Sequence, residues 1–474
     1  MVSNTITYTV KDLIDLGIIE KPLDGNHGGI HPKSSDYVED GIPFIMASDL
    51  INGHVDIKGC KFISEEQAKS LRKGFAKEGD VLLSHKATIG RTAVVGKLST
   101  DFIVLTPQIT YYRVLDLTRL NPRYLKYYFD SEAFQALFEQ WAGGGSTRLY
   151  LGITEQMKLP IELPEIKIQN KIVDLVDSFD RKVTLNRQVN QTLEQMAQAL
   201  FKSWFVDFDP VVDNALDAGF FEQELDLPDE LLRRAEARKA VRAQAGFNPL
   251  PAATRQLFPA AFEPCDEPSL GLGGWVPKGW SVSTTGDELT VKGGSTPSTT
   301  NPEFWEGGDI HWTSPKDLSG NPDKVLLTTE RKITSAGLDK ITSGLLPPET
   351  VLMSSRAPVG YLAITKIPTA INQGYIAVTN TKHLSQEFVL YWLDSNIDMI
   401  KSLSGGTTFA EISKKTFRTI PIIVPTQKTI DWASNIIRSN LDKISANAEE
   451  CRQLEKLRDY LLPKLISGEL EVNS

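Results

Sequence analysis

The chain has 474 residues, of which 41% are hydrophobic and 8% aromatic, and its formal net charge is −9. This composition is typical of a globular chain of about three domains and argues against a fibrous or disordered protein. Three widely spaced cysteines argue against a disulfide framework or a zinc site, and neither a signal peptide nor a membrane span is recognisable. We therefore expect a cytoplasmic protein that has no contact with the membrane.

Residues 1–164 are predicted to form a globular domain of mixed sheet and helices. Runs such as "GIPFIM", "GDVLLS" and "IVLTPQITYYRV" are punctuated by glycine and proline and indicate short strands. One helix should follow, with Asn121 as N-cap and Pro122 at its first position, and end at the glycine cluster 143–145. Its apolar face is expected to comprise Leu125, Tyr128, Phe129, Phe134, Leu137 and Trp141.

Residues 165–210 are predicted to form a long helix, helical over about 166–205. Its apolar positions alternate at spacings of four and three residues, which is the pattern of a coiled-coil seam. The seam positions are Ile172, Val176, Phe179, Val183, Asn186, Asn190, Leu193, Ala197, Leu200 and Trp204.

Residues 211–268 form a connector that holds six basic and eleven acidic residues, so it carries most of the negative charge. The stretch 229–245 has helical composition. The proline-rich remainder is expected to be ordered only where Phe258 and Phe262 find a surface to pack on.

Residues 269–425 repeat the first domain, and residues 426–474 repeat its long helix, over about 427–466. The strings "DIHWTS", "TVLMSS" and "AINQGYIAV" indicate strands, and Ser385 is expected to cap a helix that ends at Gly405 and Gly406. The second seam comprises Ala433, Ile437, Asn440, Ile444, Asn447, Cys451, Leu454, Leu461 and Leu465.

The two copies match at nearly constant spacing. The offset is 268 between Asp49 and Asp317, 270 between Gly90 and Gly360, and 261 between the two long helices. Each copy should therefore own a core, and a pseudo-twofold relation would make the long helices antiparallel. Asn186 and Asn447 fall on the same seam position, where they either fix the register or lie on a solvated flank.

Catalytic motifs are missing from this pattern. The sequence has no phosphate-binding loop and no methyltransferase loop, and its six histidines lack the spacing of metal ligands. His27 and His31 share a glycine-rich segment that is more simply a surface loop without a ligand. We therefore predict a chain with no catalytic residues and no metal site.

Polar residues that recur in both copies are the candidates for a binding surface. "SHKATIGR" corresponds to "SSRAPVG", and Gln108 is matched with Gln373. Arg and Gln contact base edges, while Lys, Ser and Thr suit phosphates. Because each domain is nearly neutral, weak DNA affinity is expected for the chain alone. The candidates for DNA contact are Lys33, Lys86, Arg91, Gln108, Ser146, Thr147, Arg148, Lys316, Arg356, Gln373, Thr407 and Thr408.

These features occur together with "GIPFIMASDL", "LTPQITYYR", "GGSTRLYLGITEQMKLPIELP", "LEQMAQALFKSWFVDFDPV" and "LRDYLLPKLISGELEV". With two copies and a long helix after each, the chain resembles the specificity subunit of type I restriction-modification systems over essentially its whole length. The resemblance implies an α+β protein with two target recognition domains, 1–164 and 269–425. Each would read one half of an asymmetric, bipartite site in double-stranded DNA, and an antiparallel coiled-coil spacer would set the distance between the half-sites.

The resemblance also implies partners that perform the chemistry. Two modification subunits would methylate adenine with S-adenosylmethionine, and translocase-nuclease restriction subunits would use ATP and Mg²⁺, so this chain itself would hold no cofactor. One alternative is a specificity subunit of a related system whose partner fuses methyltransferase and nuclease. Another is a scaffold whose two domains bind proteins and never touch DNA.

Overall fold

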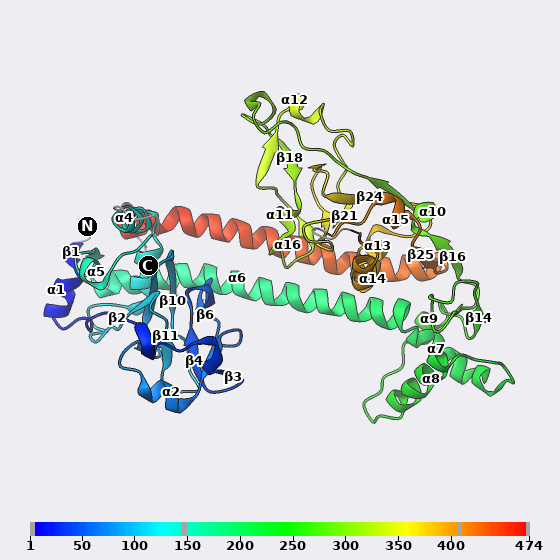
Figure 1. Ribbon diagram of the computed structural model, residues 1–474, viewed down its shortest axis with the longest axis horizontal. Coiled ribbons are helices and arrows are strands. Elements are labelled where there is room, and N and C mark those ends of the chain that lie inside the picture. The colour runs from blue at the N-terminus through cyan, green and yellow to red at the C-terminus, as the bar shows by residue number, and fades with distance from the viewer. Residues whose placement is uncertain (1–4, 144–148, 406–409, 471–474) are drawn as a thin grey trace. The chain divides into compact units, whose positions relative to one another are not determined.

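A computed structural model describes residues 5–143, 149–405 and 410–470 of the chain (Figure 1). The chain divides into two compact units, unit 1 with residues 1–183 and 452–474, and unit 2 with residues 184–451. Each unit combines one globular domain with part of each of two long helices, α6 (Ile166–Phe201) and α16 (Gln427–Ile466). The domain borders predicted from the sequence stay predictions.

The main sheet of unit 1 has six strands. The β6–β10 pair is parallel and the others are antiparallel, so the sheet is mixed, as predicted. In sheet order the strands are β2 (Leu23–Asp24), β12 (Ile109–Tyr112), β9 (Val81–Lys86), β10 (Thr88–Val94), β6 (Gly53–Val55) and β5 (Leu50–Ile51).

The main sheet of unit 2 repeats this order without the last strand. Its β19–β22 pair is again parallel, as β6–β10 is in unit 1. The strands are β17 (Leu289–Lys292), β24 (Tyr375–Thr381), β21 (Val351–Ser354), β22 (Leu362–Thr365) and β19 (Val325–Leu326). The duplication read from the sequence is therefore a duplication of topology.

A smaller sheet accompanies each main sheet, and three of its strands correspond between the units. In unit 1 this sheet has the strands β3 (Tyr37–Val38), β7 (Lys61–Ile63), β4 (Ile42–Ile45), β11 (Ile103–Leu105) and β8 (Phe75–Ala76). In unit 2 it has β20 (Arg331–Ile333), β18 (Ile310–Thr313) and β23 (Ala370–Ile371), which correspond to β7, β4 and β11. The first and last strands of each domain pair antiparallel: β1 (Ile6–Thr9) with β13 (Pro160–Leu163), and β16 (Ser281–Thr284) with β25 (Pro421–Val424). In unit 2, β14 (Phe262–Pro264) also pairs with β15 (Trp275–Pro277).

Short helices complete the two domains. In unit 1 they are α1 (Val10–Asp15), α2 (Glu65–Ser70) and α5 (Ile153–Gln156); in unit 2 they are α10 (Thr285–Glu288), α11 (Pro315–Leu318), α12 (Ser335–Leu338) and α15 (Lys414–Arg418). None of the helices in the described ranges has the length and apolar character needed to cross a bilayer.

The single helix expected before each glycine cluster is wrong, because each unit has two. In unit 1, α3 (Pro122–Asp130) is capped by Asn121 as predicted, but Ser131 is extended and starts α4 (Glu132–Ala142). The Ser131 hydroxyl accepts the Phe134 amide, which favours a new helix over continuation. The break turns Trp141 outward, leaving it 36% exposed, whereas Phe138 is buried.

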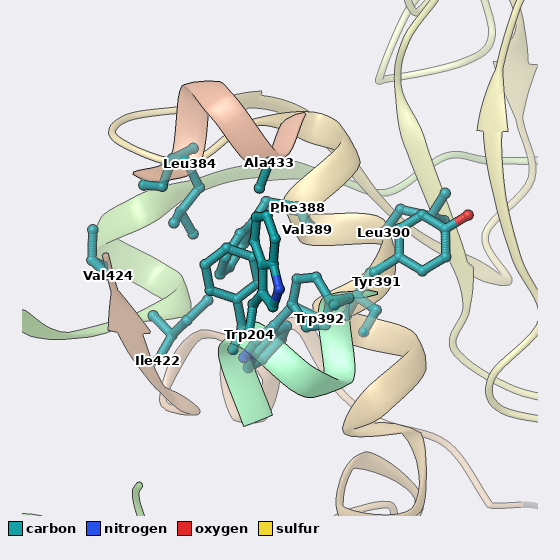
Figure 2. Close-up of a cluster of buried hydrophobic side chains, with 14 of the residues drawn as sticks. Trp204, Leu384, Phe388, Val389, Leu390, Tyr391, Trp392, Ile422, Val424 and Ala433 are labelled. Atoms are coloured by element: carbon teal, nitrogen blue, oxygen red, sulfur yellow. The ribbon is translucent and has the colours of Figure 1, made fainter. Parts of the chain in front are cut away.

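The equivalent break in unit 2 lies at Asn396, between α13 (Gln386–Ser395) and α14 (Ile397–Ser402). Ser385 caps α13, as predicted, by accepting the Phe388 amide at 3.0 Å. Figure 2 shows Phe388 and Trp392 of α13 packed with Trp204, Ile422 and Ala433 in the core of this unit. The helix after the strands therefore carries the packing that joins the domain to the long helices.

The two long helices are antiparallel within each unit. In unit 1, Asp180 of α6 accepts from Arg458 of α16 at 2.8 Å, and Ile172 lies in the same core as Leu465. In unit 2, Asn190 of α6 binds Asn447 of α16. As residue numbers rise along α6 they fall along α16, which confirms the predicted antiparallel coiled coil.

The burial of α6 and α16 follows the predicted seams. Each of the seam positions is buried or half-buried, and the half-buried ones are Phe179, Leu193, Leu200, Asn440, Leu454 and Leu461. Leu441 and Leu462 are also buried but lie outside the predicted second seam. The second helix is therefore wider on its apolar side than a strict coiled coil.

The connector is more ordered than predicted. It contains α7 (Asp209–Asp217), α8 (Asp229–Arg242) and α9 (Ala252–Arg255). Arg238 of α8 binds Asp213 of α7 through two nitrogens, at 2.9 and 2.7 Å, and such pairs fix two helices against each other. Phe258 and Phe262 are buried, as expected for the proline-rich part.

Candidate nucleic-acid interface

The two units share one irregular turn, which in unit 1 lies between β9 and β10. The Ser84 hydroxyl accepts the Arg91 amide at 2.8 Å, and in unit 2 the Ser354 hydroxyl accepts the Tyr361 amide at the same distance. Ala87 and Ala357 occupy corresponding places with φ of 66° and 53°. The segments matched in the sequence therefore share this hydrogen bond and the left-handed alanine, although the Ala357–Pro358 peptide bond of unit 2 is cis.

A second segment of each domain lies against this turn. Tyr150 pairs with Lys86, and the Leu151 amide donates to the His85 carbonyl at 3.0 Å. In unit 2, Glu411 pairs with Arg356 in the same way. The residues that follow the glycine-rich loops thus reach the turns that carry the candidate cations.

The side chains on this shared turn differ between the units. Lys86 is exposed and its ammonium lies 5.8 Å from the centre of the Tyr150 ring, while Tyr150 is 48% exposed. Arg356 is instead 3.9 Å from the carboxylate of Glu411. One turn therefore presents a cation beside an exposed aromatic ring, and the other presents an ion pair.

The remaining candidates are placed as follows. Lys33 is exposed and its amide donates to Asp36, and the Arg91 guanidinium donates to the Ala47 carbonyl at 3.2 Å. Lys316 pairs with Glu330 at 2.8 Å. Ser146, Thr147, Arg148, Thr407 and Thr408 lie outside the described residues. Their roles in DNA contact stay predictions.

The predicted match between Gln108 and Gln373 is wrong by one residue. The Gln108 carbonyl accepts the His85 amide at 2.8 Å, and the equivalent bond in unit 2 runs from Ser355 to the Gly374 carbonyl at 2.8 Å. The strand offset falls from 270 at β9 and β21 to 266 at β12 and β24. Alignment by residue type hid this shift. Gln373 instead accepts from Thr296 at 2.7 Å.

A second matched feature escaped the sequence analysis. A Cβ on Gly25 would lie 1.9 Å from the Leu105 carbonyl oxygen, and one on Gly294 would lie 1.8 Å from that of Ile371, so both positions require glycine. The next side chains, Asn26 and Ser295, both donate to a lysine carbonyl. The offset of 269 between the glycines was the signal that could have revealed the pair.

Beside Gly25, unit 1 has a polar cluster that the sequence did not predict. The Asp24 carboxylate binds Lys73 and lies 2.8 Å from His27 Nε2, and these partners lower its pKa against the effect of burial. His85 is fully buried, with Nδ1 3.0 Å from the Leu151 carbonyl. Burial lowers the pKa of His85 to about 4, so this ring is neutral at pH 7 and adds no charge to the surface.

Within the parts of the chain that the structure describes, no group of three or more His, Cys, Asp or Glu side chains is arranged to hold a metal ion. His27 binds Asp24, which also binds Lys73, and His31 packs on Phe44 with ring centres 5.6 Å apart. These two histidines are used for structure in unit 1.

Comparison with known proteins matches both copies to the same domain. A sequence model of the type I restriction modification DNA specificity domain matches residues 7–195 and residues 277–456. The specificity subunit of the type I restriction enzyme HindI of Haemophilus influenzae is 29% identical over 457 residues, covering 90% of this chain and 94% of that protein.

Two further similarities are more limited. The MjaIX specificity subunit of Methanocaldococcus jannaschii is 33% identical over 186 residues, covering 39% of this chain and 43% of that protein. The crystal structure of a type I restriction-modification S subunit from M. genitalium has a TM-score of 0.51 at 14% identity and covers 98% of this chain and 96% of that one. At that identity the likeness supports the fold alone.

Proposed function

This chain belongs to the type I restriction-modification DNA specificity family, as a specificity subunit and not an enzyme, and we propose that each of its units reads one half of an asymmetric, bipartite site in double-stranded DNA. Family membership also favours this function over a protein-binding scaffold.

One observation carries the proposal. Both units present the same turn on the same strand order, yet they offer Lys86 with Tyr150 in one case and Arg356 with Glu411 in the other. A shared turn and strand order with different side chains is what two readers of different base sequences require, because base edges are distinguished by side-chain donors and acceptors. The two half-sites should therefore differ.

In this proposal the long helices set the distance between the two half-sites. Helices α6 and α16 each run from one unit into the other, and they pair antiparallel within each unit. Readers of one duplex face approach it about one helical turn apart, roughly 34 Å. In our proposal two modification subunits bind the complex and methylate adenine with S-adenosylmethionine, restriction subunits with ATP and Mg²⁺ join for cleavage, and the assembly acts in the cytoplasm.

The test is methylation mapping of the full complex. We would express the chain with its modification subunits in a host that lacks adenine methylation and find the modified sites by single-molecule sequencing. A variant would lack residues 183–189 of α6 together with 448–454 of α16, one heptad from each helix. This removes about 10 Å of helix pair, so the gap should shorten by about three base pairs, at roughly 3.4 Å each, with unchanged half-sites.

Met196→Gln is the matched control, because Met196 lies on α6 and is 57% exposed. It should leave the gap as it is in the wild type. Methylation at a continuous site would refute the bipartite function. An unchanged gap in the shortened variant would refute the claim that the long helices set the half-site spacing.

A further inference from the structure

In unit 2, one buried ammonium joins the recognition domain to the long helix. Lys324, in the turn before β19, has its Nζ 2.8 Å from a Glu194 carboxylate oxygen on α6 and 2.7 Å from Asp394 at the end of α13. The Tyr391 hydroxyl donates to the other Glu194 oxygen at 2.7 Å, and its ring centre is 5.5 Å from the ammonium. The Lys324 side chain is 16% exposed.

Unit 1 has a corresponding junction. Lys126 Nζ lies 2.8 Å from Asp130 and 4.4 Å from the centre of the Tyr127 ring, and its side chain is 10% exposed. The Tyr127 hydroxyl lies within hydrogen-bond distance of two carboxylates on α6, 2.6 Å from Asp177 and 2.8 Å from Asp180. The tyrosine thus contacts the carboxylates of α6, and the lysine, which pairs with an aspartate of its own helix, reaches α6 through the tyrosine ring.

The tyrosines and the aspartates of the two junctions correspond. Tyr127 matches Tyr391, and Asp130 matches Asp394, both with an offset of 264. The domain side of the two junctions is therefore equivalent, whereas the helix carboxylates lie on α6 in both units, which follows the domain of unit 1 and precedes that of unit 2.

The lysines do not correspond, because they come from different elements. Lys126 is on α3, where unit 2 has Leu390. The strand pair β6–β10 of unit 1 matches β19–β22 of unit 2. In this match Gly53 and Lys324 hold equivalent positions, with φ of 78° and 48°. A Cβ on Gly53 would lie 2.7 Å from Lys126 Nζ, so a side chain at the one position would displace the ammonium of the other from its present place.

We infer that Lys126 and Lys324 are positioning residues that fix the angle of each recognition domain on α6, Lys324 through its ion pair with Glu194 and Lys126 through the Tyr127 ring, and that both junctions hold an ammonium although its lysine comes from different elements. A buried ion pair adds little net stability over an apolar core but demands defined geometry. An ammonium is present at both junctions although its lysine comes from α3 in unit 1 and from the turn before β19 in unit 2. This is explained if the protein needs the geometry that the ion pair imposes. The inference rests on the proposed function, since domain angle matters only to a reader of spaced half-sites.

The exchange itself supplies the experiment. Lys324→Met removes the ammonium of unit 2, and the double variant K324G/L390K rebuilds it in the manner of unit 1. Lys239→Met is the control, because its exposed pair with Glu236 lies in the connector. The full chain, in complex with its modification subunits, would be assayed for gap length by methylation sequencing. Spin labels at Asp339 and Lys443, both in unit 2, would report the distance from the domain to α16 in a cysteine-free background.

We expect Lys324→Met to broaden the label distance distribution and to methylate sites with at least one additional gap length. K324G/L390K should restore the narrow distribution and the single gap, and the control should behave as the wild type. Tyr391→Phe provides a milder variant that keeps the ring and removes one hydrogen bond.

The inference is overturned if Lys324→Met and Tyr391→Phe both keep the narrow distribution, or if the exchanged lysine restores neither readout. A broader distribution with an unchanged gap also overturns the positioning role, while the bipartite function stands. Failure of the wild-type complex to methylate a bipartite site would instead refute the proposed function.

Discussion

The buried asparagines of unit 2 allow a quantitative test of how the spacer keeps its register. Asn190 and Asn447 are 1% and 2% exposed, and Asn447 donates to the Asn190 side-chain oxygen at 2.9 Å. Asn190 in turn donates to the Ile444 carbonyl and to Asp323, both at 3.2 Å. The pair that fixes the register is therefore 190 with 447, and Asn186 instead binds Glu450 at 2.7 Å.

The expected losses follow from the groups left without partners. Asn447→Leu leaves the buried Asn190 oxygen without its donor, which costs about 1–3 kcal/mol. Asn190→Leu should cost more, because it also removes the donor to Asp323, a carboxyl whose pKa burial already raises. The double variant should be about as stable as Asn190→Leu alone, so the coupling energy should be about 1–3 kcal/mol.

Urea unfolding followed by tryptophan fluorescence measures these values in the right unit. Seven of the eight tryptophans lie within residues 184–451. Gln188→Leu, at an exposed position of α6, is the control and should change the unfolding free energy by less than about 0.5 kcal/mol. Strictly additive losses would show that the two asparagines do not interact and would refute the register role.

Three further outcomes are expected. Phe388→Ala should lose about 3–5 kcal/mol in the same assay, because its ring lies 5.0 Å from two other phenylalanine rings, while the 36% exposed Met399 should tolerate alanine. The pKa of His85 is about 4 in the fold against about 6.5 unfolded, so unfolding takes up a proton between these values. Stability should therefore fall as pH drops from 6.5 towards 4, by up to roughly 3 kcal/mol, and His85→Ser should remove that part of the pH dependence in calorimetry. Lys86→Gln should lower the salt slope of DNA binding by about one in fluorescence anisotropy of the full complex, whereas Lys239→Gln should not.

Local patterns in the sequence determined much of this protein. The seam of α6, the caps at Asn121 and Ser385, and the repeat itself depend on spacings within a few turns or on one long offset. Helical periodicity and capping are properties of neighbouring residues, so they can be read without a fold. The missing catalytic motifs likewise required only the sequence.

Tertiary structure decided which side chains meet. Asn190 finds Asn447, and Lys324 finds Glu194, across more than one hundred residues of chain. The ammonium comes from Lys126 beside Gly53 in unit 1, and from Lys324 in unit 2, where Leu390 holds the position of Lys126. No sequence pattern at these positions indicates that they are related. Such pairings depend on the packing of separate elements, which leaves no periodic trace, and so the junctions and the true register became visible only in the folded chain.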